Sequence, residues 1–187
     1  MTEQELIRGC LEGDERSYEE LFNRYEARAL RVAYALLGDR LEAEDASQEG
    51  FVQAFRTLHR QEPGSSFGPW LYRAVVWAAR KRGRKFRRWR DALASFADRS
   101  DEVVGASHVD ELEARSTVIE ALRDLSLEHR AVIVLRYYLD LPEAEVAAIL
   151  GCRVGTVKSR KARALRHLAR SPWLAWRVAR LEGPSNA

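Results

Sequence analysis

Two Gly-Asp pairs, at 13–14 and 38–39, divide the N-terminal part of the chain into segments whose apolar side chains recur at helical spacing. Glycine takes the left-handed conformation that ends a helix, and the aspartate after it can cap the next helix. The sequence therefore predicts three consecutive helices, the first opened by the capping-box spacing of Thr2 and Glu5 and the third with Val52 on its apolar side. No alternating strand pattern occurs in the chain, so an all-α fold is expected.

A fourth helix is predicted from Pro69, after a loop at 59–66 that contains Pro, Gly and Ser residues. It begins apolar, but residues 71–90 hold nine Lys or Arg side chains and no Asp or Glu. This basic block indicates contact with nucleic acid. Residues 91–116 reverse the charge, with seven acidic and two basic side chains and no sustained period, which favours a linker. Two further helices are predicted after the linker, at 117–125 and 127–139.

A helix-turn-helix is predicted at 142–168. Pro142 suits a first helical position, Gly151 suits the turn, and Val154 begins the apolar stripe of the second helix. Residues 153–170 contain seven Lys or Arg and no Asp or Glu. Side chains outside the stripe are expected to face the major groove of DNA, where Lys and Arg contact guanine edges or phosphates. An ordinary solvated basic helix is the alternative interpretation.

Several classes of function find no support in the composition. Cys10 and Cys152 lie far apart, without the spacing of metal ligands, so neither a metal site nor a cofactor is expected. Four scattered histidines and no nucleophile paired with a base argue against an enzyme. No stretch approaches the roughly 20 apolar residues of a membrane span, and the N-terminus does not resemble a signal peptide, so a cytoplasmic protein is expected.

Two segments resemble a known family. DRLEAEDASQEGFVQAF (39–55), followed by SFGPWLYR (66–73) and the basic block, resembles region 2 of a bacterial extracytoplasmic-function (group 4) sigma factor of RNA polymerase. LRYYLDLPEAEVAAILGCRVGTVKSR (135–160) resembles region 4 of the same family. Helices like GTVKSR also occur in response-regulator output domains, but here both segments occur in the order and at the separation of the family.

The resemblance implies two small helical domains joined by a flexible acidic linker. Region 2 would span 1–91, the linker 92–116, region 4 with its helix-turn-helix 117–171, and a C-terminal tail 172–187. Such a protein directs RNA polymerase core to specific promoters and assists promoter melting. The linker would thread through the polymerase, whereas composition alone also fits a plain tether. The β-prime clamp helices and the β flap of the polymerase, promoter DNA and an anti-sigma factor are the implied partners.

The resemblance also assigns polymerase binding to the third predicted helix. The residues concerned are Asp45, Gln48, Glu49 and Phe51. Acidic and amide groups would orient the helix on a basic partner while apolar neighbours supply contact area. Without the resemblance, the acidic side chains of this helix would be interpreted as a solvated face.

Region 2 of the family also opens the minus-10 element of the promoter. A melted strand offers base faces and phosphates, so its recognition needs aromatic rings, cations and a pocket for a flipped base, here the loop 59–66. The implied contacts are His59, Arg60, Phe67, Trp70, Tyr72, Arg73, Trp77, Arg80, Lys81 and Arg84. At least one of Phe67 and Trp70 is expected in the core, so more weight falls on Tyr72 and the cations. Trp77 stands where the family often has Asn, and it favours stacking over hydrogen bonding.

Region 4 of the family binds the minus-35 duplex. The implied contacts are Arg153, Thr156, Lys158, Ser159, Arg160, Ala162, Arg163 and Arg166. Arg153 replaces the usual Ser or Pro and weakens the N-cap of the helix. Lys161 replaces an apolar residue, and its stem is expected to pack while its ammonium reaches towards phosphate.

Two other functions compete with the sigma-factor interpretation. A stand-alone helix-turn-helix regulator would dimerise through its N-terminal helices and bind a palindromic operator without polymerase. A nucleoid or RNA-binding protein would use the basic block at 71–90 and bind without sequence preference.

Overall fold

The computed structural model describes the backbone of residues 1–94 and 118–170, and the side chains of residues 1–83 and 118–170. Within these ranges the secondary structure is helical and contains no strand, as the sequence predicts. The predicted linker lies outside the described residues from position 95 onward, and so does the predicted tail. The fourth helix begins at Phe67 rather than Pro69 and continues to Ala94, three residues into the predicted linker.

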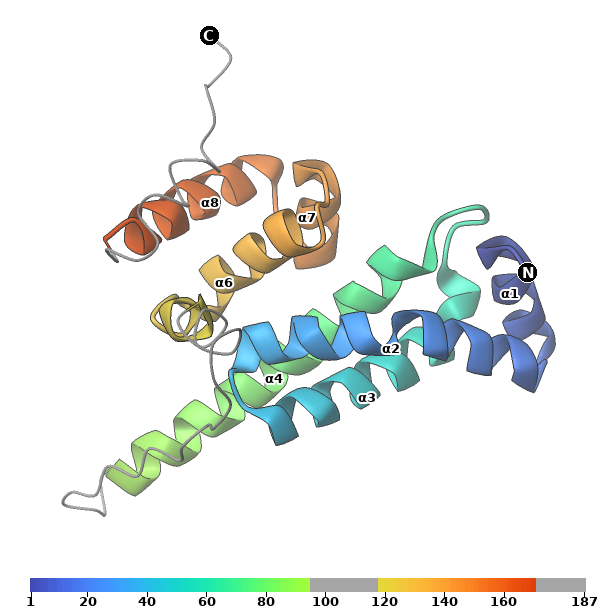
Figure 1. The fold of residues 1–187 in the computed structure, drawn as a ribbon, viewed down its shortest axis with the longest axis horizontal. Helices are drawn as coiled ribbons and strands as arrows, with labels where there is room; N and C mark the ends of the chain where they lie inside the picture. Colours follow the sequence, from blue (N-terminus) through green and yellow to red (C-terminus); the bar gives the residue numbers. More distant parts are fainter. Residues whose placement is uncertain (95–117, 171–187) are drawn as a thin grey trace, which may run out of the picture.

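The first four helices form an N-terminal bundle (Figure 1). Its elements are α1 (Glu3–Glu12), α2 (Glu15–Leu37), α3 (Arg40–Arg56), the 3-10 turn η1 (Leu58–Arg60) and α4 (Phe67–Ala94). The boundaries follow the predicted caps: Asp14 accepts a hydrogen bond from the Ser17 amide and Asp39 from the Glu42 amide. Gly13 and Gly38 end α1 and α2 with φ angles of 84° and 72°, a conformation that favours glycine.

The core of the bundle lies where α2, α3 and α4 meet, around fully buried side chains such as Leu21, Val32 and Val75. Helices α3 and α4 approach closely at Gly50. A Cβ atom at this position would lie 2.6 Å from Cγ2 of Val75 and 3.0 Å from its Cα. The absence of a side chain at Gly50 therefore sets the distance between the two helices that carry the predicted polymerase and minus-10 contacts.

The C-terminal unit contains a helix at 118–123, α6 (Leu127–Ile133), a π-helical turn η2 (Val134–Tyr138), α7 (Glu143–Leu150) and α8 (Val154–Leu168). Ser126 caps α6, as expected. The helix predicted at 127–139 is present up to Tyr138, but its second half is π-helical, and the Leu139 amide bonds to the Val134 carbonyl five residues back. Pro142 is the N-cap of α7 rather than its first helical residue, and Gly151 turns the chain into α8 with φ 64°.

The bundle and the C-terminal unit pack against each other (Figure 1), with α7 on α4 and with α6 and the π-helical turn on α2. Arg130 of α6 is 8% exposed and donates to the carbonyl of Leu36 at the end of α2. Arg123 donates to the carbonyl of Gly38 beside it. Carbonyls at a helix C-terminus lack helical partners and carry partial negative charge, which favours guanidinium groups there. No pattern in the sequence predicts this contact between the two halves.

Candidate nucleic-acid interface

The outer face of α3 presents a row of exposed side chains. Leu41 and Val52, at its two ends, are 75% and 66% exposed, and Asp45 and Gln48 lie between them at spacings of four and three residues. The prediction that Val52 points into the core is wrong, because Val52 is in phase with this outer row. Exposed apolar side chains next to polar ones can supply contact area and orientation to a protein partner.

Phe51, by contrast, belongs to the core. It is 3% exposed, and its ring centroid lies 4.7 Å from that of Phe22. The prediction that Phe51 contacts a partner is therefore withdrawn, because the ring is covered by α2. Its neighbour Val52 supplies the exposed apolar group that the prediction required.

The acidic side of α3 pairs with basic residues of α4. Nη1 of Arg82 lies 2.8 Å from Oδ2 of Asp45 and 3.1 Å from Oε2 of Glu42, and Nζ of Lys81 lies 2.6 Å from Oε1 of Glu49. Burial lowers the pKa of Arg82, but hydrogen bonding to Glu42 and the nearby carboxylates raise it by more, so the guanidinium stays charged. Carboxylates of α3 that are predicted to bind polymerase therefore form ion pairs with cations of the basic block on α4.

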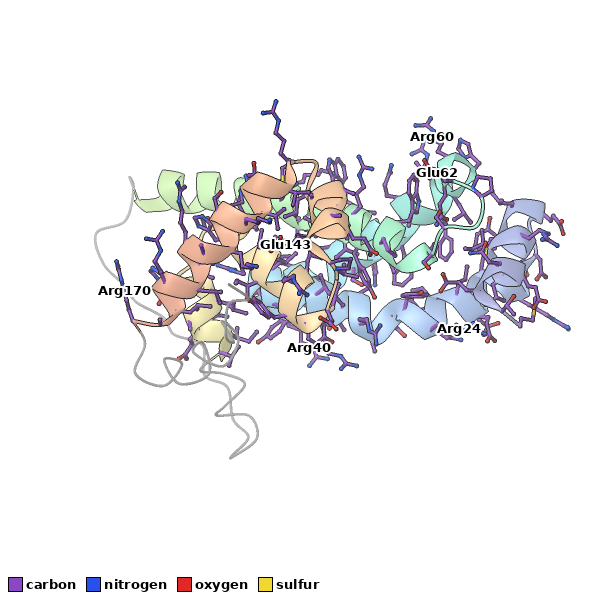
Figure 2. The ribbon with its side chains drawn as sticks, turned by 90° about the horizontal axis from the view of Figure 1, so that it is seen from above. Arg24, Arg40, Arg60, Glu62, Glu143 and Arg170 are labelled. Atoms are coloured by element: carbon purple, nitrogen blue, oxygen red, sulfur yellow. The ribbon has the colours of Figure 1, made fainter. Side chains whose placement is uncertain are left out.

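A hollow of about 430 Å³ brings together five of the predicted minus-10 contacts, namely Arg60, Trp70, Arg73, Trp77 and Arg80. Trp77 is 49% exposed, and Nζ of Lys81 lies 5.3 Å from its ring centroid. His59 and Arg60 are exposed on the 3-10 turn, and Figure 2 shows Arg60 beside Glu62 near the loop end of the bundle. An exposed indole among guanidinium groups suits a base face and its phosphates. The side chain of Arg84 lies outside the described residues.

Two of the predicted aromatic contacts are buried and cannot stack on a base in this structure. Phe67 is fully buried, with its ring 5.3 Å from that of Phe55, and Tyr72 is 3% exposed. The greater weight given to Tyr72 was therefore wrong, since its side chain points into the bundle. Trp70 is partly buried, and its Nε1 donates to the Ala54 carbonyl at 3.1 Å.

Helix α8 exposes most of the predicted minus-35 contacts along one side. The exposed set is Arg153, Lys158, Ser159, Ala162, Arg163 and Arg166, with Thr156 partly covered. Its buried stripe consists of Val157, Ala164, Leu165 and Leu168, while Val154, predicted to be part of it, is 40% exposed. No side chain caps the helix at Arg153, as predicted. Arg163, Arg166 and Arg170 line a shallow hollow together with His167, and Figure 2 shows Arg170 at the end of α8.

Two cations of α8 are engaged by carboxylates. Nζ of Lys161 lies 2.5 Å from Oε1 of Glu143 on α7, so its ammonium does not reach outward as predicted. Nη1 of Arg160 lies 2.8 Å from Oε2 of Glu128 on α6. Burial lowers the pKa of the His129 imidazole, and the positive charges of Arg160 and Arg163 lower it further.

Comparison with known proteins decides the family. The Sigma-70 region 2 model matches residues 21–94, and the Sigma-70, region 4 model matches residues 115–168. The RNA polymerase sigma-H factor of Pseudomonas aeruginosa is 30% identical over 179 residues, covering 87% of this chain and 89% of the relative. The chain belongs to the extracytoplasmic-function sigma factor family. As a sigma factor, it directs RNA polymerase.

Further relatives cover this sigma factor to a similar extent. The ECF RNA polymerase sigma-E factor of Salmonella typhimurium is 32% identical over 178 residues, covering 88% of this chain and 91% of the relative. Two solved structures at 23% identity show the same fold. RpoE of Bartonella quintana, in complex with the anti-sigma factor NepR, has a TM-score of 0.68 and covers 83% of this chain and 96% of its own. CnrH, in complex with the cytosolic domain of CnrY, has a TM-score of 0.66 and covers 98% of this chain and 99% of its own.

Sequence reasoning missed two functional candidates of this sigma factor, Leu41 and Glu128. The helical phase of Asp45 and Gln48 would have placed Leu41 on the outer face of region 2. Glu128 carried no local signal, because its role comes from pairing with Arg80 and Arg160, which lie 48 and 32 residues away in sequence.

Three further features of the described residues concern metal ligands, membrane-spanning helices and cysteines. In residues 1–83 and 118–170 no three His, Cys, Asp or Glu side chains are grouped to hold a metal ion. No helix in these parts of the chain is long and apolar enough to cross a membrane. Both cysteines are free, and burial raises the pKa of the Cys10 thiol to about 11, so this thiol stays protonated.

Proposed function

We propose that this sigma factor binds the minus-35 duplex through α8 and the melted minus-10 strand through α4. The hollow at Trp77 carries the proposal, because it joins an exposed aromatic face to the guanidinium groups of Arg60, Arg73 and Arg80. Stacking supplies affinity for an unpaired base, and cations hold its backbone. The exposed row of α8 cations suits the groove and phosphates of a duplex.

Polymerase docking is proposed at the α3 row from Leu41 to Val52. Two exposed apolar side chains supply contact area, and Asp45 and Gln48 supply orientation on the β-prime clamp helices. Region 4 would contact the β flap. An anti-sigma factor that covers these faces is a further proposed partner, supported by the complexes in which RpoE and CnrH were solved. The protein would act in the cytoplasm as a binding subunit without catalytic residues of its own.

Mobility-shift assays with and without core polymerase test this function. We expect sequence-selective promoter binding only when core is present. Val52→Glu is expected to abolish core binding, because it puts a carboxylate in the apolar part of the docking row. Leu11→Glu, at another exposed apolar position, is the matched control and is expected to bind core normally.

The competing functions predict different results in the same assay. A stand-alone regulator binds a palindromic operator tightly without core, with half-sites about one helical turn apart. A nucleoid or RNA-binding protein binds every sequence alike. Either result, together with no binding to core, would overturn the proposed function.

A further inference from the structure

One carboxylate links the two faces proposed to bind DNA. Oε2 of Glu128 lies 2.8 Å from Nη2 of Arg80 on α4 and 2.8 Å from Nη1 of Arg160 on α8. Arg80 also donates to the Leu150 carbonyl, at the end of the first helix of the helix-turn-helix. Among residues 1–83 and 118–170, Glu128 is the only acidic side chain that pairs with predicted DNA contacts from both regions.

This arrangement is incompatible with simultaneous binding of both promoter elements. Elements centred at minus 10 and minus 35 are about 25 base pairs apart, or about 85 Å along a duplex. In the structure, Arg80 and Arg160 each lie 2.8 Å from Oε2 of Glu128. The turn at residues 149–151 also lines the hollow at Trp77, so region 4 stands against the minus-10 face. The two regions must separate before both can occupy their elements.

The contacts that join the regions fall into two groups. Arg123 and Arg130 bind carbonyls at the end of α2, and none of the predicted DNA contacts takes part in these bonds. The Glu128 pairs, in contrast, use groups that phosphate would bind equally well. The side chain of Glu128 is 39% exposed and those of Arg80 and Arg160 are 21% and 25% exposed, so each pair contributes only modestly. Such pairs bias an equilibrium rather than lock it.

We propose that Glu128 holds the free sigma factor in a closed form in which Arg80 and Arg160 are withheld from DNA. Phosphates of the promoter replace the carboxylate when the regions separate. Glu128 is thus a regulatory residue of the DNA-binding surface. Its ion pairs lower the affinity of the free chain for DNA. The proposal rests on the proposed function only in taking Arg80 and Arg160 as DNA contacts.

Glu128→Gln in the full-length protein tests this proposal without polymerase. The side chain keeps its size and loses its charge, and Glu145→Gln is the control, since Glu145 is an exposed acid of α7 outside the ion pairs described. Small-angle X-ray scattering measures the radius of gyration. Fluorescence anisotropy measures binding to a random-sequence 30-base-pair duplex and to a 12-nucleotide single strand over a series of salt concentrations.

We expect Glu128→Gln to enlarge the radius of gyration and to tighten binding to both DNAs about threefold to tenfold, which corresponds to two partly exposed ion pairs. The slope of log affinity against log salt for the duplex should become steeper by about 0.9 for the phosphate gained by Arg160. The control should leave the radius unchanged and tighten binding less than twofold.

The proposal is overturned if Glu128→Gln matches Glu145→Gln in radius of gyration or in DNA affinity. Failure of the proposed function is a separate result, since it would appear as the absence of polymerase binding by the wild-type protein. Circular dichroism of both variants verifies that the helices are retained.

Discussion

The basic faces of α4 and α8 differ in how their cations are held. On α4, Arg80, Lys81 and Arg82 each pair with a carboxylate from another helix. On α8, Lys158, Arg163 and Arg166 are exposed and have no ion pair among the described residues. Apart from Arg160, which pairs with Glu128, the minus-35 face is therefore ready to meet phosphate, whereas Arg80 and Lys81 of the minus-10 face must exchange protein carboxylates for DNA. This difference suits a face that binds ordinary duplex and a face that binds only after melting.

The largest expected effect is on stability, and it distinguishes a core residue from an interface residue among the predicted minus-10 contacts. Phe67→Ala should lower the free energy of unfolding by about 3–5 kcal/mol, because it empties a fully buried ring site between α2, α3 and α4. Urea denaturation measures this loss. Trp77→Ala is the comparison and should cost less than about 1 kcal/mol, since half of the indole is already exposed. If Phe67→Ala kept full stability and lost single-strand binding, Phe67 would be a DNA contact after all.

Removal of the exposed indole tests the single-strand face directly. Trp77→Ala should weaken binding of the polymerase complex to a promoter with an unpaired minus-10 strand by about 1–3 kcal/mol, the usual contribution of one base stacked on an aromatic ring. Competition binding on forked DNA measures the effect, with binding to a minus-35 duplex as the internal control. Trp77→Phe should recover part of the loss. Equal losses on both DNAs would show that Trp77 supports the fold rather than stacks.

The corresponding change on α8 is Arg163→Ala. If Arg163 reads a base edge, the variant should lose about 1–3 kcal/mol on the preferred minus-35 sequence and discriminate less between sequences. Duplex competition assays with single-base changes measure the discrimination. Arg8→Ala, at an exposed position on α1, removes the same charge far from the helix-turn-helix. A uniform loss across all sequences would make Arg163 a phosphate contact instead.

The smallest expected effect concerns the paired cations of α4. Glu49→Gln releases Lys81 and removes one partner of Arg82, so single-strand affinity without polymerase should rise about twofold to fivefold. Minus-35 duplex affinity should not change. Glu44→Gln is the matched control, because Glu44 pairs with Arg40 on its own helix. Equal effects of the two variants would contradict the view that α4 cations are withheld by α3.

Local features of this fold could be predicted from sequence, and long-range ones could not. The caps at Asp14 and Asp39 and the turn at Gly151 depend on residues within a few positions, so the pattern was sufficient. Helical phase also placed the α8 face correctly in most positions. Phase did not decide which aromatic side chains of α4 are covered, because this depends on the rings that α2 and α3 supply.

The packing of the two halves on each other could not be predicted for the same reason. Arg130 has no acidic residue three or four positions away along its helix, and its bond to Leu36 joins residues 94 positions apart. The pairs of Glu128 likewise depend on how region 4 lies on region 2. The family resemblance supplied the order of the regions but not their packing in the free chain.

The most direct test of the account is initiation by purified core polymerase on a library of randomised promoters. We expect the wild-type chain to direct transcripts from promoters that share two separated elements. Arg163→Ala should alter selection only at the upstream element and Trp77→Ala only at the downstream one. Transcripts that do not depend on the added chain, or selection that both variants change in the same way, would contradict the central claim that α8 and α4 recognise separate parts of the promoter.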